Sequence, residues 1–187
     1  YYADDELLPG GLCPIHRLPV EEFEEENYFF RLSRFQDRLI SWYDVHPGAI
    51  VPEFRANEAL GLIRSGLRDF SASRTSLTWG IPLPWDPTHV AYVWFDALTN
   101  YLSAVGFGTD AERFEQWWPV NYHLIGKDII RHHCVYWPAM LMSAGIEPPR
   151  GWAVGGWLLS GGEKMSKTTG NVVKPLDLVD TVGVDGF

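Results

Sequence analysis

Residues 122–130 read YHLIGKDII, and the change from apolar residues to a glycine and then to charged residues indicates a strand that turns into a helix. Tyr122–Ile125 is predicted to be the strand, and Gly126 to form the turn. The helix is expected over Asp128–Gly145. Pro138 has no backbone N–H, so it should kink this helix.

Strands and helices alternate over the rest of the second half. His89–Phe95 and Trp152–Leu159 are rich in β-branched and aromatic residues, which predicts two further strands. A helix over Asp96–Gly106 should follow the first of them, and a helix over Pro175–Val182 should follow the second. This alternation indicates an α/β fold with a parallel sheet and right-handed crossovers.

The first half of the chain has a weaker pattern. Residues 1–20 contain many turn-forming residues and are predicted to form a small loop-rich element. Ser33 and Gln36 match a helix capping box. Apolar side chains follow at helical spacing, namely Phe35, Leu39, Trp42 and Tyr43. A second helix is predicted over Asn57–Gly66, and several prolines predict loops over residues 67–88.

The composition is that of a globular protein. The 187 residues are 46% hydrophobic and 21% charged, which excludes a disordered or collagen-like chain, and no apolar run reaches the ~18 residues of a membrane span. Cys13 and Cys134 are the only cysteines, which is typical of the cytosol. Because the chain starts at Tyr1, has no signal-like stretch and ends at Phe187, we expect a piece of a longer cytosolic protein.

The formal net charge of −9 is unevenly distributed. Residues 21–26 include five glutamates, whereas residues 121–175 carry six basic and three acidic side chains, a balance of +3. A positive segment within an acidic chain indicates a local anion site rather than a general nucleic-acid surface.

The strongest indication of chemistry lies in residues 161–171, which read GGEKMSKTTGN. Lys164 and Lys167 lie between glycines, so their ammonium groups could close on a phosphate chain and stabilise the charge of a transferring phosphate. The same residue types also occur in solvated surface loops that bind nothing.

A second candidate site lies at the predicted strand-to-helix turn. Ligands of open α/β sheets bind beyond the carboxyl ends of the strands, where Gly126 would let a ligand approach the backbone. Asp128 could accept hydrogen bonds from two ribose hydroxyls, and Lys127 adds positive charge. From the residue types alone, a role for Asp128 as the cap of its helix is the better-supported interpretation.

The order of residues in the lysine loop resembles the KMSKS signature of class I aminoacyl-tRNA synthetases. Residues 164–168 read KMSKT, in which Thr168 keeps the hydroxyl of the family's last serine, and residues 170–173 read GNVV. The resemblance implies that Lys164 and Lys167 contact ATP phosphates while an amino acid attacks the α-phosphate.

The same resemblance implies further contacts with ATP. The Gly126-x-Asp128 pattern resembles the family's ribose contact, with Lys127 beside it. Residues 154–158, VGGWL, resemble the stretch whose backbone packs against adenine. The ATP contacts implied in this stretch are Gly155, Trp157 and Leu158.

Three longer segments resemble the methionyl-tRNA synthetases in particular. They are residues 92–101 (YVWFDALTNY), residues 123–141, and residues 27–32 (NYFFRL) with residues 79–82 (WGIP) downstream. The resemblance implies a methionine pocket, and thioethers interact well with aromatic rings. The implied lining residues are Trp94, Ala97, Leu98, Tyr101, His132 and His133. From the residue types alone, core packing explains the aromatic residues, and a structural role explains His133.

Cys13 and His16 have the spacing of metal ligands, but a structural zinc ion needs four ligands. From the spacing alone, the absence of a metal is favoured. The related synthetases carry a zinc knuckle in the insertion between the two halves of their nucleotide-binding fold, which implies that this pair is half of a split site. Zn²⁺ would then belong to the parent protein, and this chain alone is not expected to hold it.

The resemblance implies three parts. Residues 1–75 would be the later part of the connecting insertion, residues 76–162 the second half of a Rossmann-like nucleotide-binding domain, and residues 163–187 the lysine loop with the start of the next helix. The expected partners of the parent protein are methionine, ATP with Mg²⁺ and tRNA(Met), with no membrane. The family's other signature, His-Ile-Gly-His, and its anticodon-binding domain are expected outside these 187 residues, so the chain alone should be inactive.

Two alternatives remain open. The chain could come from another class I synthetase, specific for cysteine, leucine, isoleucine or valine, although the segments around Trp94 and His133 argue against this. It could also be a non-catalytic binding module that keeps the fold, which the acidic charge balance disfavours.

Overall fold

A computed structural model describes residues 7–14, 17–21, 24–165 and 170–186, apart from the side chain of Lys164. The chain divides into two compact units. The smaller unit comprises Tyr1–Tyr28 and Ser71–Tyr92, and the larger comprises Phe29–Phe70 and Val93–Phe187. No helix among the described residues is long and apolar enough to cross a bilayer. The predicted insertion over residues 1–75 stays a prediction.

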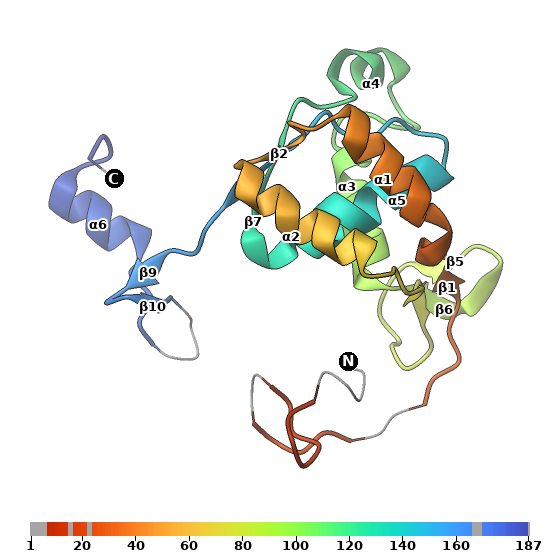
Figure 1. Cartoon of the computed structure of the whole chain (residues 1–187), viewed down its shortest axis with the longest axis horizontal. Helices are drawn as coiled ribbons and strands as arrows, with labels where there is room; N and C mark the ends of the chain where they lie inside the picture. The colour runs from red at the N-terminus through yellow and green to blue at the C-terminus, as the bar shows by residue number, and fades with distance from the viewer. Residues whose placement is uncertain (1–6, 15–16, 22–23, 166–169, 187) are drawn as a thin grey trace. The chain divides into compact units, whose positions relative to one another are not determined.

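The larger unit is built on a parallel sheet of three strands in the order β2-β8-β7. Figure 1 labels the two outer strands, β2 and β7. The strands are β2 (Ile50–Val51), β8 (Trp152–Gly155) and β7 (His123–Gly126). Their parallel pairing confirms the predicted α/β fold. The strand predicted over Trp152–Leu159 is shorter than expected, because the chain leaves this sheet at Gly155 and then forms a separate hairpin.

Two apolar clusters hold the larger unit together. The first joins the sheet to α1 (Gln36–Val45), α2 (Glu53–Arg64) and the helical residues after β7. The second joins α3 (Val93–Ser103) to α5 (Trp137–Ser143). The largest fully buried side chains of the two clusters include Leu39, Ile63, Leu98, Trp137, Leu141 and Trp152. Each such side chain contributes about 1.5–3 kcal/mol on burial, and the first cluster includes Ile125 of β7.

The helix predicted over Asp128–Gly145 consists of three consecutive segments. They are the 3-10 turn η3 (Lys127–Ile129), the π-helix η4 (Arg131–Tyr136) and α5 (Trp137–Ser143). In a regular α-helix Pro138 would have to donate to the Cys134 carbonyl, which it cannot do without an N–H. The hydroxyl of Tyr43 donates to this carbonyl instead, at 2.6 Å. The irregularity expected at Pro138 is therefore present as a π-helical segment before it.

The strand predicted over His89–Phe95 is wrong beyond Ala91. The observed strand β6 (Asp86–Ala91) lies in the smaller unit, where it pairs antiparallel with β4 (Ser73–Arg74) and β5 (Pro82–Leu83). The predicted parallel sheet therefore takes its third strand from β2, which the sequence pattern did not indicate.

The helix after this strand begins earlier than predicted. α3 starts at Val93, so Asp96 lies in its first turn and not at its cap. Leu98 and Leu102, one helical turn apart, are both buried in the second cluster. Residues 93–95 have a local preference for strand, but the burial of Leu98 and Leu102 stabilises the helix that contains them. Tertiary packing thus overrides local β-propensity here.

The capping box predicted at Ser33 and Gln36 is wrong. Ser33 lies inside the 3-10 turn η2 (Leu32–Phe35), and its backbone N–H and hydroxyl donate to the Asp69 carboxylate at 3.0 and 2.6 Å. Gln36 accepts a hydrogen bond from the Leu67 N–H at 2.9 Å. Both side chains therefore hold the residues that follow α2, and the hydrogen bonds from Ser33 lower the pKa of Asp69.

Several other bounds differ from the predictions. α2 starts at Glu53 and not at Asn57. The predicted loop over residues 67–88 contains the short strands β3 (Phe70–Ser71), β4 and β5, and β1 (Phe29–Phe30) was not predicted either. The helix α6 (Pro175–Val182) has the predicted bounds.

The helix α4 (Ala111–Trp117) was not predicted, although its sequence contains a start signal. The Asp110 carboxylate accepts a hydrogen bond from the Arg113 N–H at 3.0 Å. This is the geometry of an N-cap, and a search for Asp followed by a good helix former would have found the helix.

The smaller unit is organised around the carboxylate of Glu25. This carboxylate accepts hydrogen bonds from the backbone N–H groups of Thr75 and Ser76, at 2.7 and 2.6 Å. Arg74 Nε lies 3.8 Å from its other oxygen. Burial acts to raise the pKa of Glu25, but the hydrogen bonds from Ser76 and Thr75 lower it to about 2. The ionised carboxylate thus holds the residues after β4.

Candidate functional site

Two predicted site glycines lie side by side at the carboxyl ends of neighbouring parallel strands. Gly126 ends β7, Gly155 ends β8, and the two residues are partners in the strand register. Ligands of open α/β sheets bind beyond such strand ends. The segments that leave the two strands carry Lys127 and Asp128 on one side and Trp157 and Leu158 on the other.

The fold of the described residues does not itself require glycine at these two positions. Gly126 has a φ of −83°, which any residue adopts, and a Cβ atom added there meets nothing within 4 Å. A Cβ added at Gly155 meets only the Ile125 carbonyl oxygen, at an ordinary contact distance of 3.7 Å. The backbone at both strand ends therefore borders open space, which suits the close approach of a ligand.

A polar hollow of about 500 Å³ opens beside these strand ends. Its lining residues are Glu58, Lys127, Asp128, Arg131, His132 and Trp157. Glu58 and Arg131 were not singled out in the sequence analysis. Arg131 follows Lys127 by about one helical turn, so helical spacing could have indicated it. Glu58 lies on α2, and only the tertiary fold brings it to this hollow.

Trp157 contacts two neighbouring side chains of the hollow. Its Nε1–H donates to Asp128 Oδ2 at 2.8 Å, and Lys127 Nζ lies 3.3 Å from the centre of its ring. Asp128 lies in the first turn of η3, and Gly126 holds the N-cap position. The interpretation of Asp128 as the helix cap is therefore wrong.

The residues of the predicted methionine pocket come from two helical segments. Trp94, Ala97, Leu98 and Tyr101 lie on α3, and His132 and His133 lie on η4. The Trp94 and His132 rings stack with their centres 3.7 Å apart. Tyr101 Oη lies 2.9 Å from His133 Nε2. Leu98 is 1% exposed and packs in the second cluster, whereas Ala97 is half-buried.

Hydrogen bonds fix the direction of the Tyr101–His133 contact. His133 Nδ1 lies 3.0 Å from the Ile129 carbonyl oxygen, so Nδ1 carries the proton and donates to it. Nε2 of a neutral His133 is then an acceptor, and the Tyr101 hydroxyl donates to it. Burial lowers the pKa of His133, so its ring is neutral at physiological pH.

Two residues that the sequence analysis did not select complete this aromatic group. Trp137 Nε1–H donates to His123 Nε2 at 3.3 Å, and the rings of His123 and Tyr101 have centres 4.1 Å apart. Burial and the neighbouring His133 lower the pKa of His123 to about 4. Burial also lowers the pKa of His132 to about 4. This aromatic group therefore contains neutral histidines near pH 7.

The lysine loop is described only in part. Its start forms a hairpin of β9 (Leu159–Ser160) and β10 (Glu163–Lys164), which pair antiparallel around two glycines. These glycines have φ values of +60° and +84°, which favour glycine. The side chain of Lys164 and all of Lys167 lie outside the described part of the structure.

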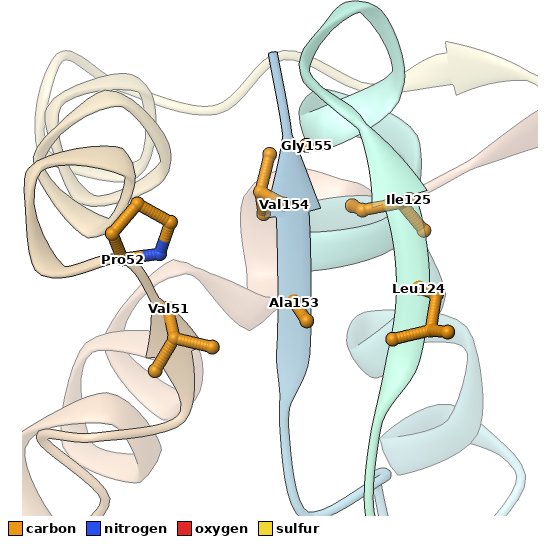
Figure 2. A pocket seen from close by; sticks show the side chains of 7 residues that line it. All are labelled: Val51, Pro52, Leu124, Ile125, Ala153, Val154 and Gly155. Carbon is orange, nitrogen blue, oxygen red and sulfur yellow. The ribbon is translucent and has the colours of Figure 1, made fainter. Parts of the chain in front are cut away.

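An apolar hollow lies across the three strands of the parallel sheet. Figure 2 shows its lining, with Val51 and Pro52 from the end of β2, Leu124 and Ile125 from β7, and Ala153, Val154 and Gly155 from β8. Leu124 is 82% exposed. None of these seven lining residues has a charged side chain.

The structure describes only one of the two predicted zinc ligands. Cys13 is buried, and His16 lies outside the described residues. Within the part of the chain that the structure describes, no three side chains of the types His, Cys, Asp and Glu form a possible metal site.

Comparisons with known proteins point in one direction. The model of the family described as "tRNA synthetases class I (M)" matches residues 8–187. A methionine–tRNA ligase of Streptomyces coelicolor is 50% identical over 194 residues, which cover 100% of this chain and 36% of that protein. One of Mycobacterium leprae is 57% identical over 195 residues, 99% of this chain and 36% of the relative.

Solved structures agree with these relatives. The structure of Mycobacterium tuberculosis methionyl-tRNA synthetase in complex with methionyl-adenylate has a TM-score of 0.90 at 50% identity. The similarity covers 98% of this chain and 37% of that one. The chain thus spans about a third of the length of the proteins that it matches.

Proposed function

Because the chain belongs to the family described as "tRNA synthetases class I (M)", we propose that it forms part of an enzyme that activates methionine with ATP and charges tRNA(Met). The observation that carries this proposal is the pairing of Gly126 with Gly155 beside Asp128, at the carboxyl ends of β7 and β8. In this proposal the strands β7 and β8 belong to the second half of a Rossmann-like catalytic domain.

ATP would bind across these strand ends. The bare backbone at Gly126 and Gly155 would let the nucleotide approach closely. The Asp128 carboxylate would accept hydrogen bonds from the ribose hydroxyls, and Lys127 would add positive charge near the phosphates. The backbone at Trp157 and Leu158 would pack against adenine.

Lys164 and Lys167 would stabilise the charge that develops on the phosphates. A carboxylate oxygen of methionine attacks the α-phosphorus, the bond from that phosphorus to the bridging oxygen breaks, and pyrophosphate leaves with its electron pair. Mg²⁺ often binds through substrate phosphates, which suits the lack of a three-ligand group among the described residues. The protein's contribution is the positioning of the two reactants and electrostatic stabilisation.

Methionine would lie between α3 and η4. Sulfur–aromatic contacts contribute about 0.3–1.5 kcal/mol each, and neutral histidines avoid placing a charge beside an apolar side chain. The proposed lining residues are Trp94, Ala97, Leu98, Tyr101, His132 and His133.

The test is methionine-dependent exchange of pyrophosphate into ATP by the natural protein that contains this sequence. Lys167→Ala is expected to lower the exchange rate about 100- to 1000-fold, the usual cost of one preorganised donor. Lys174→Ala, a lysine at the start of α6, is the matched control and should change it less than about twofold. Faster exchange with isoleucine than with methionine would contradict the proposal.

The 187 residues expressed by themselves should show no exchange, because they contain no His-Ile-Gly-His sequence. Exchange by this polypeptide that depends on methionine and on Lys167 would show that the second signature is dispensable. The cytosolic location stays a prediction from the cysteine content.

We further propose that Cys13 and His16 supply half of a split structural zinc site in the natural protein. A structural site takes four ligands, so the remaining ligands would come from residues elsewhere in that protein. Zinc analysis of the purified natural protein should give a stoichiometric amount, and Cys13→Ser should lower it. Unchanged zinc content in Cys13→Ser would remove Cys13 from the ligand set.

A further inference from the structure

Trp157 is placed so that one ring contacts two adjacent side chains in different ways. The edge of the indole donates its N–H to Asp128 Oδ2 at 2.8 Å. The face of the indole carries Lys127 Nζ, 3.3 Å from the ring centre. The ring itself is 43% exposed, so it contributes more through these two contacts than through burial in a core.

The edge contact restricts the Asp128 carboxylate. The terminal torsion of an aspartate has a broad preference, so an exposed carboxylate samples many orientations. A charge-assisted hydrogen bond to one oxygen selects among them. An ionised carboxylate offers about four acceptor sites, so the Asp128 carboxylate can accept ribose hydroxyls in addition to the indole N–H.

The face contact restricts Lys127. A lysine next to an aspartate can fold its ammonium group onto the carboxylate and compete with a ligand for the same oxygens. Tryptophan has the most favourable aromatic face for a cation. The ring therefore gives the ammonium group an alternative position that leaves the carboxylate accessible.

We propose that Trp157 is a positioning residue for the nucleotide, which sets the Asp128 carboxylate to receive the ribose hydroxyls. This inference rests on the proposed function, in which Asp128 binds the ribose of ATP. Trp157 lies between β8 and the β9–β10 hairpin, so it also ties the base of the lysine loop to the ribose site.

The test removes the indole N–H and the ribose hydroxyls separately. Trp157→Phe keeps an aromatic ring but loses the donor, and 2′,3′-dideoxy-ATP lacks both hydroxyls. In methionine-dependent exchange by the natural protein, Trp157→Phe should raise the KM for ATP about tenfold, close to the lower limit for losing a hydrogen bond to a charged group. The KM for methionine should change less than about twofold, and with 2′,3′-dideoxy-ATP the loss in kcat/KM should shrink to about twofold or less.

Two controls separate positioning from general damage. Trp117→Phe changes a tryptophan of α4 that is 57% exposed and should leave both KM values unchanged. The midpoint of thermal unfolding of Trp157→Phe should stay within about 2 °C of the parent protein, since little buried area is lost. In an Asp128→Ala background, Trp157→Phe should add less than about a twofold further loss.

An equal loss with both nucleotides, or no loss with ATP, would overturn the inference and leave the proposed function intact. A lower unfolding midpoint together with an equal loss would assign Trp157 a merely structural role and would likewise overturn it. Absence of methionine-dependent exchange in the unmodified natural protein would instead remove the proposed function itself.

Discussion

The hydroxyl of Tyr43 donates a 2.6 Å hydrogen bond to the carbonyl oxygen of Cys134, the oxygen that Pro138 leaves without its α-helical donor. Tyr43 lies on α1 and Cys134 on η4, so a side chain from one helix completes the backbone hydrogen bonding of another. Burial also raises the pKa of Tyr43 well above its usual value, so the hydroxyl keeps its proton at any physiological pH.

Tyr43→Phe should therefore destabilise the protein. Loss of the hydroxyl leaves a buried carbonyl oxygen without this donor, which costs about 1–3 kcal/mol. The free energy of unfolding from urea titration measures the loss, with Tyr122→Phe, at a tyrosine that is 52% exposed, as control. Equal small effects of the two substitutions would mean that water or another donor replaces Tyr43.

The stability of the protein should fall as the pH drops below 6.5, partly through His123. Its pKa is about 4 in the folded state, lowered by burial and by His133 from 6.5. The unfolded chain therefore takes up the proton first, and the stabilisation present above pH 6.5 is lost as the pH falls toward 4. One such group accounts for about 2 kcal/mol at pH 5.

Comparison with His123→Gln tests this assignment. The variant should lose less stability between pH 7 and pH 5 than the parent protein does, in urea titrations at both values. If the variant and the parent protein had the same pH dependence, other groups would be responsible for it. His132 is one such group, because its pKa is also lowered to about 4.

If methionine binds between α3 and η4 as proposed, Tyr101→Phe should weaken methionine binding more than ATP binding. The substitution removes the donor to His133 Nε2 at 2.9 Å, so the ring nitrogen of a buried histidine loses this hydrogen bond. We expect the KM for methionine to rise about 3- to 10-fold, the effect of one neutral hydrogen bond, with little change in the KM for ATP. A change in the KM for ATP alone would place Tyr101 outside the methionine site.

Gly155→Ala should impair ATP use without harming the fold. The added Cβ would meet only the Ile125 carbonyl oxygen at 3.7 Å, so the free energy of unfolding should change by less than about 0.5 kcal/mol. If a nucleotide packs against this backbone, its KM should rise about tenfold, equivalent to about 1.4 kcal/mol. Gly48→Ala, where an added Cβ meets nothing within 4 Å, is the control.

Local patterns predicted the parts of the fold that depend on a few neighbouring residues. The strand predicted over Tyr122–Ile125 is present one residue later, as His123–Gly126. The helix predicted over Pro175–Val182 is present with the same bounds. Residues 93–95 were predicted as strand but are helical, because contacts with distant residues decide their conformation. Their strand preference is local, whereas the helix is stabilised by burial of Leu98 and Leu102 against other segments.

The candidate site was predictable to the extent that it follows strand ends. Gly126, Lys127 and Asp128 were selected because they follow an apolar strand. Their contacts were not predictable, since Trp157 reaches Asp128 over 29 sequence positions. Glu58 enters the same hollow from α2, and no periodic pattern in one segment can indicate such a meeting.

The order of the parallel sheet has a consequence for how the chain folds during synthesis. β8 lies between β2 and β7 but is the last of the three to be translated. Residues 50–51 and 123–126 therefore lack their common neighbour in this sheet until residues 152–155 have left the ribosome. Pairing of β2 with β8 over about 100 positions favours slow assembly. The unpaired edges of β2 and β7 are therefore sites of aggregation until β8 has been synthesised.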